Sequence, residues 1–138
     1  MTQDRTKLLR YALRADAVFC ALAAVDALLF SERIAELLGI AEPRIVSALG
    51  VGLLAWAVHL VVASRRDTLS LKEAWYFVGG GLLWIVGSVG LILAGPFSTQ
   101  GNWLVGLVAV AVLAFTEAQY LGIRRLRDET PTLVRHAA

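Results

Sequence analysis

The chain has 138 residues, of which 58% are hydrophobic and only 17% are charged, and its formal net charge is +2. A soluble domain carries about 25% charged residues and needs a polar surface over its core, so this composition disfavours a soluble enzyme, a disordered chain and a nucleic-acid-binding module. It predicts a small integral membrane protein. The one cysteine, Cys20, excludes an intrachain disulfide and is expected to be a small core residue.

Four apolar blocks follow one another at residues 13–30, 45–63, 74–94 and 103–123. A membrane-spanning helix needs about 20 such residues, and open strands cannot satisfy their backbone in lipid. The pattern predicts an all-α fold, an antiparallel four-helix membrane bundle over residues 1–127, with a flexible cytoplasmic tail at 128–138. The first block has some features of a cleaved signal peptide, but Asp26 interrupts it, which favours a retained span.

Short polar segments predict where the helices begin and end. Residues 31–39 place three aliphatic side chains on one face and charged side chains elsewhere, which predicts a short amphipathic helix at the membrane surface. Ser70 and Glu73 fit a capping box that opens the third long helix. Gly95 is expected to end that helix, and residues 98–102 are expected to form the turn into the fourth.

The basic residues predict the orientation. Eleven of the thirteen Lys and Arg residues lie before or at the very start of the first block, between the second and the third or after the fourth, and only Arg33 and Arg44 lie elsewhere. By the positive-inside rule, both termini and the middle loop lie in the cytoplasm, with the chain in a bacterial-type inner membrane. Four of these residues are also candidates for binding anionic lipid headgroups: Arg65, Arg66, Arg124 and Arg125.

Small residues predict how the helices pack, because helices in lipid gain little from apolar contact and approach closely at small side chains. The third block carries two small-residue stripes, and the second has a small-residue face that includes His59. The stripes are expected to pack helices, or to leave room for a flat hydrophobic ligand or a partner helix. The packing candidates are Gly52, Gly80, Gly81, Gly87 and Ser88.

Three ionisable residues, Asp26, His59 and Glu117, lie within the blocks, where a charge at the centre costs about 2.5–3.5 kcal/mol. His59 and Glu117 lie at similar depth on small-residue faces that are expected to point into the bundle. If their helices are adjacent, the pair handles protons, anchors a ligand headgroup, or forms an interhelical hydrogen bond. Asp26 is expected to cap the surface segment near Arg33 or to reach outward.

Further polar and aromatic residues lie beside these three. Trp56, Trp84 and Gln119 complete the candidate ligand-binding or proton-handling set, with the two tryptophans either filling the bundle or lining a pocket. Asp16 is expected to form an interfacial ion pair with Arg14.

Several segments resemble small four-span bacterial membrane proteins of DoxX-like organisation. They are a basic start into the first span, residues 49–54 opening the second, 84–88 at the centre of the third and 119–126 closing the fourth. The resemblance implies a four-helix bundle and supplies no catalytic residues.

No complete catalytic or metal-binding set is present in the blocks, since one His and one Glu make an incomplete zinc or di-iron site. The sequence therefore predicts a non-enzymatic membrane module. It is either an accessory or scaffold subunit or a binder of a lipid-like molecule, and its partners are the bilayer, a second copy or other membrane subunits. One alternative is a proton-coupled transporter or channel that works as an oligomer through Glu117 and His59. Another is a quinone- or haem-linked redox subunit; no other cofactor is expected.

Overall fold

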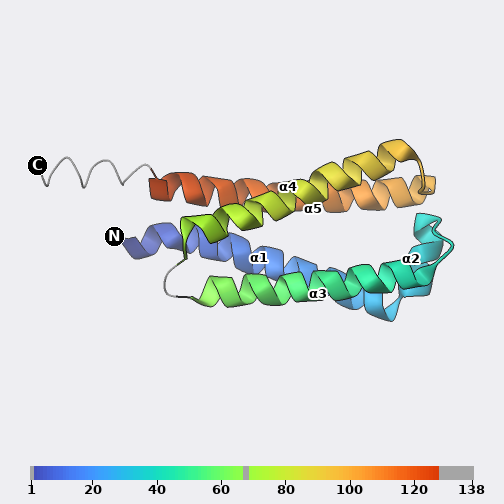
Figure 1. Ribbon diagram of the computed structural model, residues 1–138, viewed down its shortest axis with the longest axis horizontal. Coiled ribbons are helices and arrows are strands. Elements are labelled where there is room, and N and C mark those ends of the chain that lie inside the picture. The colour runs from blue at the N-terminus through green and yellow to red at the C-terminus, as the bar shows by residue number, and fades with distance from the viewer. Residues whose placement is uncertain (1, 67–68, 128–138) are drawn as a thin grey trace, which may run out of the picture.

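A computed structural model describes residues 2–66 and 69–127, with side chains from residue 7 onward. These residues contain no strand and form five helices: α1 (Thr2–Leu29), α2 (Ser31–Leu38), α3 (Pro43–Arg65), α4 (Leu71–Ala94) and α5 (Thr99–Arg127). The four long helices run antiparallel (Figure 1). We call the end where α1 starts and α5 stops the basic end, and the opposite end, which α2 crosses, the α2 end. The predicted tail at 128–138 lies outside the described residues.

Three of the helices, α3, α4 and α5, are long and apolar enough to cross a membrane. The first helix is long enough, with 28 residues, but Arg14, Asp16 and Asp26 interrupt its apolar part. It is therefore less apolar than the other three long helices and is not among the candidate spans. The chain is thus an all-helical protein with three candidate spans among its described residues, which is one fewer than the four apolar blocks predict.

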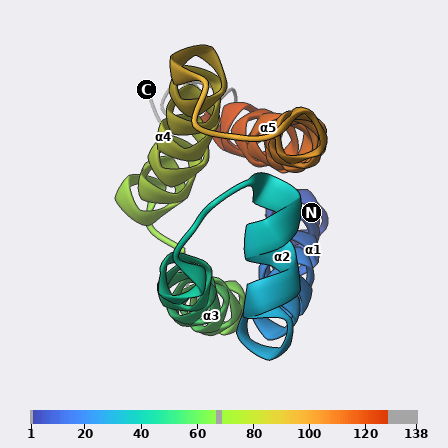
Figure 2. The same cartoon turned by 90° about the vertical axis from the view of Figure 1, so that its right-hand side faces the viewer.

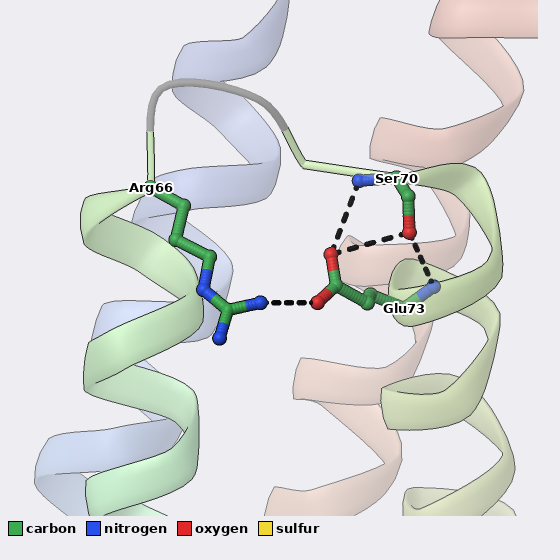
Figure 3. A network of polar contacts seen from close by, with 3 residues as sticks. All are labelled: Arg66, Ser70 and Glu73. Carbon is green, nitrogen blue, oxygen red and sulfur yellow. Dashed lines mark hydrogen bonds and ion pairs between the residues drawn. The ribbon is translucent and has the colours of Figure 1, made fainter.

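The capping residues explain where the helices begin and end. The predicted capping box is confirmed: Ser70 Oγ accepts from Glu73 N at 3.2 Å, and Glu73 Oε2 accepts from Ser70 N at 3.3 Å (Figure 3). Gly95 ends α4 in the left-handed region at φ 74°, as predicted, which a residue with a Cβ rarely adopts. The predicted turn at 98–102 is wrong, because Ser98 Oγ accepts from Gly101 N and starts α5 at Thr99.

The long helices pack as two hairpins. The first is α1 with α3, the second is α4 with α5, and α1 against α5 joins the two. At the α2 end, Ser98 N donates to Leu38 O at 2.9 Å, which ties α2 to the start of α5. In contrast, α4 starts beside α3 at the basic end and tilts away from it towards the α2 end (Figure 2). Backbone contact between α3 and α4 is therefore slight.

Close approach between the helices depends on glycines that the sequence pattern did not single out. A Cβ at Gly122 of α5 would lie 3.0 Å from Leu9 Cβ of α1, and one at Gly101 would lie 2.8 Å from the backbone of Leu38. Gly50 approaches α1 in the same way. Each position brings two backbones together, as expected for helices that gain little from apolar contact.

The buried core is divided into two clusters along the long axis. One cluster lies towards the basic end and includes Leu13, Leu60, Phe77 and Ile123. A smaller one lies towards the α2 end, and its members are Ala27, Ala35, Leu38 and Val46. The residues between these clusters on α1, α3 and α4 line a cavity.

Candidate ligand-binding site

A cavity of about 330 Å³ lies between the two core clusters, with a wall from each long helix. Its lining is almost wholly apolar, with one charged side chain, Asp16. The lining residues are Asp16, Phe19, Cys20, Ala23, Leu49, Gly52, Leu53, Trp56, Gly80, Gly81, Leu83, Trp84, Val108 and Val112.

Small residues at the wall leave this volume open. Gly52 has nothing within 4 Å of the place where a Cβ would lie, so its face of α3 leaves space. Gly80 and Gly81 each touch a neighbour on one side, Trp56 of α3 and Thr116 of α5, and also line the cavity. The cavity thus begins where the aromatic contact between α3 and α4 ends.

That aromatic contact closes the cavity towards the basic end. The Trp56 ring lies 5.5 Å from the Tyr76 ring and 5.7 Å from the Phe77 ring, centroid to centroid. The His59 ring lies 5.2 Å from the Phe77 ring and stacks near Trp56. His59 therefore supports the aromatic end wall.

A second hollow of about 800 Å³ continues the first towards the α2 end. Leu49, Leu83 and Trp84 line both, so the two form one groove between α3 and α4. Gly87 and Ser88 line this outer part, and Gly87 has nothing within 4 Å of its Cβ position. Gly52 and Gly87 are therefore not helix-packing residues in this structure, because the tilt of α4 turns both towards open space.

The polar end of the cavity is a hydrogen-bonded cluster of Asp16, Cys20 and Gln119. Asp16 is 8% exposed and Gln119 is 1% exposed. Gln119 Nε2 donates to Asp16 Oδ2 at 2.9 Å across the α1–α5 contact, and Cys20 Sγ donates to Asp16 Oδ1 at 3.5 Å. The predicted ion pair with Arg14 is wrong: Arg14 is exposed, because residues two apart on a helix point in different directions.

Two buried polar atoms, one on a groove-lining residue and one on a member of this cluster, have no partner among the described residues. They are the indole nitrogen Nε1 of Trp84 and the amide oxygen Oε1 of Gln119. A buried donor or acceptor left unsatisfied costs about 1–3 kcal/mol. Trp84 lines both parts of the groove, but its indole nitrogen is itself fully buried, so other atoms of the ring face the open space.

None of the predicted residues His59, Glu117 and Asp26 lines this cavity, although His59 lies behind its aromatic end wall. His59 and Glu117 are both exposed, contrary to the expectation that they point into the bundle, and α3 and α5 are not packed against each other. No hydrogen bond or ion pair joins His59 to Glu117 in the described part of the chain. Asp26 is also exposed, on the last turn of α1. The structure does not bring these three residues together.

The arginines proposed for lipid headgroups are exposed near the basic end: Arg65, Arg66, Arg124 and Arg125. Arg66 is engaged within the chain, since its Nη1 donates to Glu73 Oε1 at 2.5 Å (Figure 3). Its carbonyl oxygen also accepts from Arg10 Nη2 at 3.0 Å. These contacts hold Arg66, at the end of α3, against α1 and the start of α4.

Sequence reasoning placed Trp56, Trp84 and Gln119 among the candidates but missed Asp16 and Cys20. The sequence did contain a signal for these two residues, since residues four apart lie on one helix face and Gln119 interrupts an otherwise apolar helix.

Residues 2–66 and 69–127 hold no group of three or more His, Cys, Asp and Glu side chains placed to bind a metal. The chain matches no protein-family model, no curated protein and no solved structure.

Proposed function

We propose that this chain is a four-span membrane bundle that binds a lipid-like hydrophobic molecule in the groove between α3 and α4. It lies in a bacterial inner membrane with both termini in the cytoplasm. The observation that carries the proposal is the apolar cavity of about 330 Å³ between the two core clusters. Binding sites for small molecules have volumes of about 300–1,000 Å³ and mostly apolar walls with few polar groups, as this one has.

The shape of the cavity supports an occupant. It is not enclosed, and it continues into the second hollow as one groove between α3 and α4. An apolar molecule that enters sideways from the lipid would make dispersion contacts with walls that otherwise have no packed neighbour on that side.

The placement of charges on α1 supports its crossing as the fourth span. Asp16 is buried and hydrogen-bonded to Gln119, so its carboxyl does not face hydrocarbon. Asp26 lies in the last turn of α1, where a side chain can reach the interface. In this proposal the basic end faces the cytoplasm, in accordance with the positive-inside rule.

The transporter and redox alternatives find less support. A proton relay through His59 and Glu117 needs the two side chains close together, and the structure leaves them apart and exposed. A haem needs an axial ligand, and the one candidate that lines the groove, Cys20, has its thiol engaged in a hydrogen bond to Asp16.

The test fills the groove without disturbing helix contacts. Gly52→Leu and Gly87→Leu place a side chain into open space within the groove, whereas Gly90→Leu places one into open space outside it, on the same helix as Gly87. The full chain and each variant are purified from membranes in mild detergent, and bound hydrophobic molecules are extracted and identified by mass spectrometry. We expect a stoichiometric molecule with the unsubstituted chain and with Gly90→Leu, and its loss with the two groove variants. Equal retention by all four proteins would refute the site.

A further inference from the structure

We infer that the molecule in this groove is a single-chain amphiphile with a cationic ammonium headgroup, bound with the ammonium at Asp16 and the chain directed towards the α2 end. This inference rests on the proposed function and adds the chemical class of the ligand. It is carried by the one charged side chain of the groove, by the position of that side chain and by the apolar lining beyond it.

The groove carries a negative group that has no counterion among the described residues. Asp16 is the one charged side chain of the described part of the chain that lines either hollow, and no Lys, Arg or His there does so. Its hydrogen-bond partners, Cys20 and Gln119, are both uncharged. A buried charge without a partner of opposite sign is unfavourable, so only a proton or a cationic ligand can offset it. The groove therefore complements a cation and selects against a phosphate or a fatty-acid carboxylate.

The same carboxyl favours an ammonium over a neutral headgroup. A carboxylate offers about four lone-pair sites, and Gln119 and Cys20 each donate to a different oxygen of Asp16, which leaves sites for a further donor. A hydroxyl could donate to them, but it would leave the negative charge uncompensated. An ammonium donates and also brings the opposite charge, and hydrogen bonds with ionised partners are about twice as strong as those between neutral groups.

Asp16 lies where the groove is nearest the basic end. Of the residues that line the groove, Asp16 is the first on α1, which starts at the basic end, and Trp56 is the last on α3, which stops there. Phe19, one turn from Asp16 on α1, also lines the cavity. Aromatic rings attract cations through their faces, so aromatic residues near the carboxyl suit an ammonium better than an anion.

Beyond Asp16 the groove is long enough for one hydrocarbon chain in one leaflet. Along α4 it extends from Gly80 to Leu91, which corresponds to about 16 Å at about 1.5 Å per residue. This is close to half of a hydrocarbon core of about 30 Å. The outer part is lined by apolar residues and Ser88, so it suits a chain and offers no second charge.

The experiment compares ligands that share a dodecyl chain and differ only at the headgroup. The full chain in a nonionic detergent, stripped of bound lipid, is titrated at pH 7 with dodecylamine, 1-dodecanol and dodecanoic acid, and bound ligand is counted by native mass spectrometry. An alkylamine is protonated at this pH, as is the lysine amine with its usual pKa of about 10.4. We expect dodecylammonium to bind at least about tenfold more tightly than the alcohol or the acid, a factor that a hydrogen bond to a charged group supplies.

One variant locates this preference at the carboxylate. Asp16→Asn keeps the shape of the side chain and removes its charge, so we expect the ammonium-over-alcohol preference to fall to about threefold or less while the alcohol still binds. Glu117→Gln is the matched control, because Glu117 is an exposed carboxylate of α5 outside both hollows, and it should leave the preference unchanged. If Asp16→Asn does not fold, the three ligands on the unsubstituted chain and on Gly52→Leu still decide, since Asp16 is the one charged group that lines the groove.

The outcomes separate the two proposals. If none of the three ligands binds, the proposed function fails. If all three bind, Gly52→Leu abolishes binding and the alcohol or the acid equals the amine, the groove stands and the inference of a cationic headgroup is overturned. A tenfold preference for the amine that survives Asp16→Asn, or amine binding that survives Gly52→Leu, would also overturn it.

Discussion

The hydrogen bond between α1 and α5 makes a specific prediction about stability. Gln119→Leu keeps the approximate volume of a side chain that is 1% exposed and removes the amide that donates to Asp16 Oδ2 at 2.9 Å. The carboxyl then keeps only the longer contact from Cys20, at 3.5 Å. We expect Gln119→Leu to destabilise the protein because a buried polar group loses its best partner.

The magnitude follows from how such bonds behave in membranes. Loss of a partner of a buried charged group costs about 1.5–3 kcal/mol in soluble proteins, whereas interhelical hydrogen bonds in a membrane protein average about 0.6 kcal/mol and reach about 1.7. Asp16 sits in a tight α1–α5 contact rather than in lipid, so we expect about 1–2 kcal/mol for Gln119→Leu. In the double variant Asp16→Leu with Gln119→Leu, both polar groups are gone, so a coupling of about 0.6–1.7 kcal/mol should appear.

Reversible unfolding in mixed micelles with increasing dodecyl sulfate, followed by tryptophan fluorescence, measures these differences. The two single variants, the double variant and the unsubstituted chain complete a double-mutant cycle. A coupling of zero within error would contradict the α1–α5 packing described above. The control Glu117→Gln, which changes an exposed carboxylate of the same helix, should leave the midpoint unchanged.

Two further predictions concern packing and orientation. Gly122→Leu should destabilise the protein by about 1–3 kcal/mol in the same unfolding assay, because its side chain would enter the α1–α5 contact; Gly106→Leu, into open space, should have little effect, and equal effects would contradict the contact. For orientation, Cys20 is buried, so an impermeant maleimide applied to intact cells reports introduced thiols. Gln100→Cys should be labelled from outside and Lys72→Cys only after lysis, and the reverse pattern would overturn the proposed topology.

The positions of the helices could be predicted from the sequence with good accuracy. The capping box at Ser70 and Glu73, the glycine that ends α4 and the amphipathic segment that became α2 are local features, and each depends on residues within one or two turns. The start of α5 was missed because Ser98 serves as a cap and the chain there resembles a turn. Hydropathy also predicted long apolar helices, which the structure contains.

Which face of each helix is buried was decided only by the tertiary structure. In α3 the small-residue face with Gly52 and His59 is exposed, while the face with Gly50 and Leu60 packs against α1. Lipid is as apolar as the protein interior, so hydropathy does not distinguish the two faces of such a helix. The position of the candidate binding site was likewise decided by the tertiary structure. Composition and hydropathy pointed to a membrane protein, but the groove exists because α4 tilts away from α3, and the partner of Asp16 lies 103 residues away on another helix.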